Sequence, residues 1–194
     1  MVDECDRGLF VGRFQPLHDG HRRVLETVSE NVDELLVGVG SAGRSHSVDN
    51  PYTGGERVEM VLRTAEAADV TGPVHPIPLR DVDRNAVWVS HVRSLCPDFS
   101  VVYSHNPLVV RLFREAGVSV DTFPTYERER YEGTRVRRRM LDGDSWRELV
   151  PDPVASVVED VDGVERIRRI DREDAAGVDR VPGTPEAVGD ADDT

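Results

Sequence analysis

Short apolar runs alternate with amphipathic, helix-length segments from residue 9 to residue 122 of this 194-residue chain. The runs with the character of buried strands are residues 9–11, 34–40, 74–79, 99–103 and 118–122. Apolar side chains recur at helical spacing in the segments between them, 22–30, 56–68, 85–95 and 107–116. This alternation predicts an α/β fold with a doubly wound parallel sheet, which binds ligands at the carboxyl ends of its strands.

The rest of the chain completes one expected domain and a tail. Pro76 and Pro78 predict that the run at 74–79 lies at an edge or an end of the sheet. Helices expected from Gly133 to about Ile170 would pack on the sheet, so that residues 1–170 form one domain. Residues 171–194 are acidic and contain hardly any large apolar side chain. We expect them to form a largely disordered tail that only aids solvation, and partner binding is the alternative.

The charge of the chain limits its partners. Its formal net charge is -13, and all 24 basic residues are arginines. The absence of lysine excludes a lysine Schiff base and a Walker-type phosphate loop. The sequence contains no basic patch with interleaved aromatic residues, so it does not indicate nucleic-acid binding. An acidic, lysine-free surface resembles that of proteins from salt-loving organisms, and a GC-rich genome that favours arginine over lysine is the other explanation.

Neither a membrane nor an oxidising compartment is indicated. No apolar run approaches membrane-spanning length, and Asp3, Glu4 and Asp6 stand where a signal peptide would have its basic region. Cys5 and Cys96 are too few for a disulfide framework or a zinc cluster. We therefore expect a cytoplasmic protein.

The most specific motif is GRFQPLHDGH at residues 12–21, which follows the first expected strand and is expected to form a turn and the first turn of a helix. Gly12 and Gly20 permit tight turns and the close approach of a ligand. Free N–H groups at a helix start, together with the helix dipole, form an anion site, and we expect His18 and His21 to face it. Histidines that merely pack are the plainer interpretation, but His-x-Gly-His directly after a strand is a rarer pattern.

This motif resembles the His-x-Gly-His motif of nucleotidyltransferases, which join a nucleoside triphosphate to a phosphate. Its longer form with Arg-Phe-Gln-Pro resembles the archaeal-type nicotinamide-nucleotide adenylyltransferases, and the resemblance runs from about Gly8 to Ile170. It implies that ATP and nicotinamide mononucleotide (NMN) are the substrates and that Mg²⁺ is bound to them, without a metal site of the protein's own. It also implies a homo-oligomer.

A second motif, EGTRVR at residues 132–137, resembles the family's downstream nucleotide motif, Ser-Gly-Thr-x-Val-Arg. Thr134 can cap a helix start or contact a phosphate, and Arg137, one turn on, can direct its forked guanidinium at the β- and γ-phosphates. Glu132 replaces the serine that the family usually has, which removes a hydroxyl from this position. The neighbouring arginines at 135, 138 and 139 are equally explained as a solvated helix face or as partners of acidic neighbours.

The resemblance implies which residues handle ATP. His18 and His21 would bind the α-phosphoryl and bridging oxygens, and Arg137 would neutralise the leaving pyrophosphate, so these three are the expected catalytic residues. The implied ATP-binding residues are Gly12, Phe14, Gly20, Asn106, Thr134 and Arg137. Asn106 belongs to the segment SHNP at 104–107, which resembles a nucleotide-binding Ser-x-Asn-Pro with His105 in place of a small residue.

The acceptor site is expected beyond the first three strands. The implied NMN-binding residues are Arg13, Ser41, Asp81, Asn85 and Trp88. Trp88 would stack on the pyridinium ring, a cation–π contact worth ~0.5–2 kcal/mol; alternatively, Asn85 or Asp83 caps a helix and Trp88 belongs to the core. Residues 41–47 resemble a loop that helps to hold the acceptor phosphate. Asp49 stands where some relatives have a basic residue, and Arg44 is a possible substitute for that residue.

Together these residues predict an adenylyl transfer. The acceptor phosphate would attack the α-phosphorus of ATP in line, without a covalent enzyme intermediate, and catalysis would consist of positioning and charge stabilisation. The expected reaction converts ATP and NMN to NAD and pyrophosphate. The alternatives are the same transfer to FMN or phosphopantetheine and a nucleotide sensor without catalysis.

Overall fold

The computed structural model describes residues 6–124, 126 and 131–177. Parallel strands form a five-stranded sheet in the order β3-β2-β1-β4-β5. They are β1 (Arg7–Gly12), β2 (Glu34–Val39), β3 (Val74–Pro78), β4 (Val101–Tyr103) and β5 (Ser119–Asp121). The predicted parallel α/β sheet is confirmed, and β3 with its two prolines lies at an edge, where a missing N–H does least harm to the sheet.

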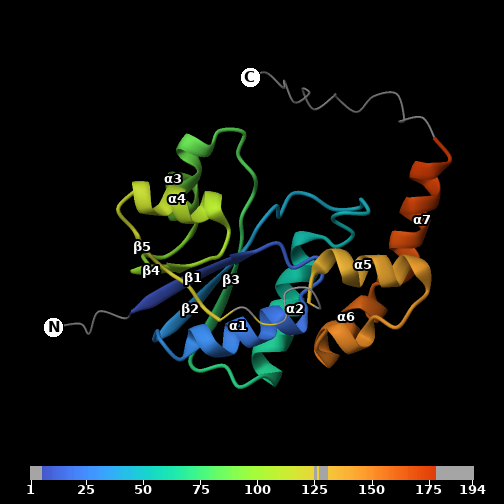
Figure 1. Ribbon diagram of the computed structural model, residues 1–194, viewed down its shortest axis with the longest axis horizontal. Helices are drawn as coiled ribbons and strands as arrows, with labels where there is room; N and C mark the ends of the chain where they lie inside the picture. The colour runs from blue at the N-terminus through green and yellow to red at the C-terminus, as the bar shows by residue number, and fades with distance from the viewer. Residues whose placement is uncertain (1–5, 125, 127–130, 178–194) are drawn as a thin grey trace.

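Helices cover both faces of this sheet (Figure 1). They are α1 (Asp19–Ser29), α2 (Gly54–Ala67), α3 (Asn85–Leu95) and α4 (Pro107–Glu115). Because neighbouring residues of a strand point to opposite faces, β1 contributes to two separate cores. Phe10 packs in the cluster that contains the apolar side of α1 and α2, whereas Leu9 packs with residues of α3 and α4.

The C-terminal helices form a further layer. They are α5 (Gly133–Asp142), the short 3-10 helix η1 (Arg147–Leu149), α6 (Asp152–Asp160) and α7 (Gly163–Ala175). We expected these helices to pack on the sheet, but α2 covers that part of it, and α6 packs against α2 while α5 packs against α7.

Helix α7 passes Ile170, where we expected the domain to end, and continues to Ala175. Its last turns are polar, and the exposed Arg172 pairs with Glu165, two turns earlier on the same helix, at 2.7 Å. The remainder of the predicted tail, residues 178–194, lies outside the described residues. Every helix in the described part of the chain is too short or too polar to span a membrane.

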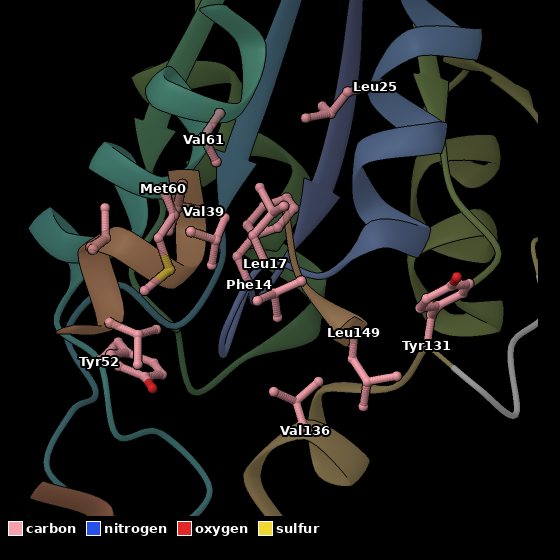
Figure 2. Close-up of a cluster of buried hydrophobic side chains, with 14 of the residues drawn as sticks. Phe14, Leu17, Leu25, Val39, Tyr52, Met60, Val61, Tyr131, Val136 and Leu149 are labelled. Carbon is pink, nitrogen blue, oxygen red and sulfur yellow. The ribbon is translucent and has the colours of Figure 1, made fainter. Parts of the chain in front are cut away.

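The loop between β1 and α1 is part of the core. Phe14 and Leu17 are buried beside Val39 in the cluster drawn in Figure 2. Phe14 adopts a left-handed backbone conformation with φ of 52°, which turns its ring back onto Gly12. A Cβ atom at residue 12 would lie 2.7 Å from that ring. Packing therefore requires glycine at position 12. The buried Phe14 ring, which belongs to the motif itself, fixes the motif to the core.

Removing the Phe113 side chain should destabilise the fold. Phe113, on α4, is fully buried and contacts the rings of Trp88 and Phe99 edge to face. Phe113→Ala should lower the free energy of unfolding by about 3–5 kcal/mol, because it leaves a cavity in the smaller core. Arg111→Ala, at an exposed position of the same helix, should cost less than ~0.5 kcal/mol. Urea unfolding measures both values, and equal losses would contradict this account.

Candidate active site

A cavity of about 580 Å³ lies at the carboxyl ends of β1 and β4. These neighbouring strands lie where the order of the sheet reverses, the usual place for a ligand in an open parallel sheet. The cavity is lined by the residues that begin three helices: His18, Gly20 and His21 for α1, Ser104–Asn106 for α4, and Glu132–Thr134 for α5. Helix N-termini offer free N–H groups and partial positive charge. The cavity is therefore suited to a polyanion although the protein itself is strongly acidic.

His18 and His21 cap α1 reciprocally. Nδ1 of His18 accepts a hydrogen bond from the backbone N–H of His21, and Nδ1 of His21 accepts one from the backbone N–H of His18, both at 3.3 Å. The two rings stack with their centroids 3.6 Å apart. Because each Nδ1 is an acceptor, the proton of each neutral ring is on Nε2. The cap explains why α1 begins at Asp19, directly after His18, and the first helical turn that we expected within the motif is confirmed.

Burial keeps both histidines neutral. His18 is only 8% exposed, and burial lowers its pKa to about 4. Burial and, secondarily, the adjacent His18 hold the pKa of His21 well below 6.5. The ring of Phe14 lies 4.8 Å from that of His21 and helps to enclose it. At pH 7 the pair therefore presents two uncharged N–H donors, which can bind phosphoryl oxygens.

The predicted ATP-binding residues divide into two groups. Gly20, Asn106 and Thr134 line the cavity, whereas Gly12, Phe14 and Arg137 do not. The Asn106 side chain accepts hydrogen bonds from the backbone N–H groups of Leu108 and Val109, so it caps α4. A Cβ atom at Gly20 would lie 3.0 Å from Tyr131, which explains the glycine at this position.

Arg137 lies immediately behind the cavity wall. It is 4% exposed, and its Nη1 donates to the backbone carbonyl of Gln15 at 2.9 Å. Its Nη2 donates to the Thr134 hydroxyl and to the Asp49 carboxylate, both at 3.3 Å. Burial lowers the pKa of Arg137, and Asp49 counteracts this effect. Asp49, whose role the sequence left open, thus faces the arginine of the second motif.

Two of the other arginines of α5 form ion pairs with acidic side chains. Arg138 pairs with Asp142 at 3.6 Å, and Arg139 pairs with Glu148 at 2.5 Å. Both pairs fit the structural alternative for these residues.

Two of the predicted acceptor residues meet directly. The Ser41 hydroxyl donates to the Asp81 carboxylate at 3.0 Å, and Nε of Arg44 pairs with the same carboxylate at 2.8 Å. Arg44 therefore interacts with Asp81, and its suggested substitution for a base at position 49 stays a prediction. The exposed Arg13 lies in the loop after β1.

Asn85 and Trp88 both lie on α3. Asn85 is exposed in its first turn, and Arg84 is the N-cap, without a side-chain hydrogen bond. The alternative in which Asn85 or Asp83 caps the helix is therefore wrong. The half-buried Trp88 packs edge to face on Phe113, with ring centroids 5.4 Å apart. Its predicted stacking on a ligand stays a prediction.

Sequence reasoning missed the role of Gln15. Its buried amide Nε2 donates to the Tyr52 carbonyl at 2.9 Å, and its Oε1 accepts the Tyr52 N–H at 3.0 Å. This pair ties the motif loop to the segment that precedes α2. A glutamine between Phe14 and Pro16, in an otherwise apolar stretch, is a weak signal of such a bond, but its partner is 37 residues away.

The depressed pKa of His18 predicts acid sensitivity. The unfolded chain binds a proton at this position below about pH 6.5, whereas the folded chain binds it only near pH 4. Stability should therefore be lost as the pH falls from 6.5 to 4, by about 3 kcal/mol at pH 4. His18→Asn keeps a capping oxygen but cannot titrate. Chemical unfolding at pH 7 and pH 4 should show a smaller loss for this variant, and equal losses would refute the assignment.

Comparison with known proteins places this geometry in a family. Residues 9–139 match the model of the cytidylyltransferase-like family. The nicotinamide-nucleotide adenylyltransferase of Halobacterium salinarum is 55% identical over 173 residues, which cover 89% of this chain and 97% of that protein. The enzyme of the same name from Haloarcula marismortui is 47% identical over 191 residues, covering 96% of this chain and 100% of that protein.

Solved structures share the fold. A bifunctional NMN adenylyltransferase/ADP ribose pyrophosphatase from Francisella tularensis, complexed with AMP and a manganese ion, superposes with a TM-score of 0.71 at 20% identity. The match covers 89% of this chain and 53% of the Francisella chain, so this protein spans about half of that enzyme. From the family model and the close relatives together, the chain belongs to the cytidylyltransferase-like family and, within it, to the nicotinamide-nucleotide adenylyltransferases.

Proposed function

We propose that this protein transfers the adenylyl group of ATP to the phosphate of NMN, forming NAD and pyrophosphate. The observation that carries the proposal is the stacked His18–His21 pair, whose Nε2 donors stand at a cavity where three helices begin. Such a site can hold a triphosphate and stabilise charge on its α-phosphoryl group. The choice of NMN as acceptor rests on the close relatives, which are named for that reaction.

The histidines would act as hydrogen-bond donors, not as bases. An acceptor phosphate is already a nucleophile, so its attack on the α-phosphorus needs no proton removal. Nε2–H groups of His18 and His21 would donate to the α-phosphoryl and bridging oxygens, where negative charge grows during in-line displacement. Neutral rings that are held by their own helix cap need no reorganisation before this step.

The triphosphate tail would extend from the histidines to α5. Gly20, Asn106 and Thr134 would contact it from the cavity wall, and Gly12 and Phe14 would shape the loop behind the histidines. For Arg137 to neutralise the leaving pyrophosphate, its Nη2 would exchange the Asp49 carboxylate for a phosphate oxygen. Asp49 would thus hold Arg137 until substrate arrives.

A divalent cation, Mg²⁺ by our expectation, would supply further neutralisation of the phosphates. In the described ranges, no three His, Cys, Asp or Glu side chains gather at a site that could hold a metal ion. Substrate oxygens and water would therefore provide most of its ligands, as is common for Mg²⁺ with nucleotides. The chain's own residues would act on the phosphates directly.

NMN would bind beside the cavity, against Arg13, Ser41, Asp81, Asn85 and Trp88. The Ser41–Asp81 contact brings the loops after β2 and β3 together. The Trp88 indole, supported by Phe113, would offer its accessible side to the cationic pyridinium ring. That the protein is a homo-oligomer stays a prediction, and sedimentation can measure its oligomeric state.

The reaction is tested by supplying Mg-ATP and NMN and measuring both pyrophosphate and NAD. We expect equimolar products, and more activity in molar KCl than at low salt because salt screens the self-repulsion of a chain with a charge of -13. FMN and phosphopantetheine serve as control acceptors. Adenylylation of either one with NMN inert would overturn the choice of acceptor, and ATP binding without turnover of any acceptor would favour a sensor.

Replacing His21 tests the proposed mechanism. His21→Ala should lower turnover at least ~100-fold, because a donor to the developing charge is lost. His75→Ala is the matched control, since His75 is exposed on the edge strand β3 and outside the cavity, and it should retain full turnover. Both variants are compared by steady-state kinetics after their folding is checked by circular dichroism. Unchanged turnover of His21→Ala would refute the role of the pair.

A further inference from the structure

Arg57, in α2, is buried in an unusual way. Its exposed fraction is 0%, and all five N–H donors of its guanidinium point to backbone carbonyls. Nε donates to Thr53 at 3.1 Å, Nη1 to Arg13 at 2.8 Å and Gly40 at 2.7 Å, and Nη2 to Ser41 at 3.0 Å and Arg44 at 3.5 Å. The longest of these bonds is the one to Arg44.

These carbonyls belong to the loops at the proposed acceptor site. Arg13 directly follows β1, and Gly40, Ser41 and Arg44 follow β2. A single amino group, Nη1, bridges the two loops. Beside this bridge, the N–H of Gly40 donates to the carbonyl of Gly12, the last residue of β1, at 2.8 Å. Arg57 is thus the point at which both loops are fastened to α2.

Ser41 depends on this fastening. Its φ of 49° lies in the left-handed region, which is unfavourable for serine and persists only when the surroundings impose it. Nη2 of Arg57 holds the Ser41 carbonyl, and the Ser41 hydroxyl then reaches Asp81. The backbone geometry that Arg57 imposes therefore sets the direction of a side chain in the proposed acceptor site.

Arg57 also places a charge under these loops. A buried arginine usually pairs with a carboxylate, as the less buried Arg166 does with Glu56 at 2.7 Å. None of the hydrogen bonds of Arg57 goes to a carboxylate in the described part of the chain. Burial lowers the pKa of Arg57 to about 10, so the guanidinium remains charged at neutral pH. Its positive charge favours an anion bound at these loops.

We propose that Arg57 is a positioning residue for the acceptor: its five backbone hydrogen bonds hold the β1–α1 and β2–α2 loops in the one arrangement that binds the acceptor phosphate. This inference rests on the proposed function. The ATP side is held separately, because Arg137 fastens Gln15 and Thr134. Loss of the Arg57 fork therefore affects the acceptor and leaves ATP binding intact.

Arg57→Lys tests this division. Lysine keeps the charge but offers three donors instead of a five-donor fork. The KM for NMN should rise at least ~10-fold and kcat should fall several-fold, because misplacement of the acceptor loops costs reactivity. The KM for ATP should stay within ~2-fold of wild type. An unchanged KM for NMN in the folded variant, or equal effects on both substrates, would overturn the proposal.

Arg168→Lys is the matched control. Arg168 is part-buried and donates through Nε to the backbone carbonyl of Met140 at 2.8 Å, within the C-terminal helices. Its replacement should lower thermal stability without separating the two KM values. If Arg168→Lys raises the KM for NMN as much as Arg57→Lys does, general destabilisation explains the effect and the proposal fails.

Amide hydrogen exchange tests the fastening of the loops without a measurement of activity. Its first result comes from the substrate-free wild type alone. The N–H groups of Gly40, Ala42 and Arg44 donate to backbone carbonyls within or beside the fastened loops. In the wild type these three amides should exchange nearly as slowly as the amides of β2. In Arg57→Lys the same three amides should exchange much faster than in the wild type. Exchange at unprotected rates in wild type would refute the fastening. Slow exchange in a wild type that forms no NAD would refute the proposed function and the acceptor role but not the fastening itself.

Discussion

The site depends above all on the hydrogen bonds that hold two residues of the loop after β1, Arg13 and Gln15. Arg57 holds the Arg13 carbonyl, Arg137 holds the Gln15 carbonyl, and the Gln15 amide pairs with the backbone of Tyr52. Buried polar groups of this kind are costly when unpaired, so each bond constrains the loop strongly. With Phe14 fixed in the core, the bonds of Gln15 hold the part of the loop that leads to His18 at the start of α1, whereas Arg57 holds the part next to β1.

An acidic protein can bind a polyanion when its positive potential is local. The cavity uses three helix N-termini and neutral N–H donors, which do not depend on the net charge of -13. The buried Arg57 and Arg137 lie behind the acceptor loops and the cavity wall. Solvent and salt screen these two charges less than they screen charges on the surface. Surface arginines such as Arg138 are engaged with acidic neighbours. Recognition of phosphate is thus separated from the charge of the surface.

Much of this arrangement was predictable because it depends on local patterns. The period of apolar residues located all the strands and helices that the structure describes before Gly133, and Pro76 and Pro78 correctly predicted an edge strand. The capping role of His18 was missed because histidine is an uncommon cap, and only its reciprocal bond with His21 reveals that role. The packing of α6 on α2 was missed because amphipathic periodicity shows that a helix has an apolar side but not which surface covers it.

The sequence by itself determined the parallel α/β fold, the strand–turn–helix motif with its two histidines, and the family resemblance that led to ATP and NMN. Only the tertiary structure decided that Arg137 stands behind the cavity wall against Asp49, that Arg44 pairs with Asp81, and that Arg57 fastens two loops. The physical reason is range: helix periodicity and turn chemistry act between residues a few positions apart. A buried guanidinium instead binds carbonyls that are distant along the chain, 44 residues away for Arg57 and Arg13 and 122 for Arg137 and Gln15. Only the folded backbone brings such groups together.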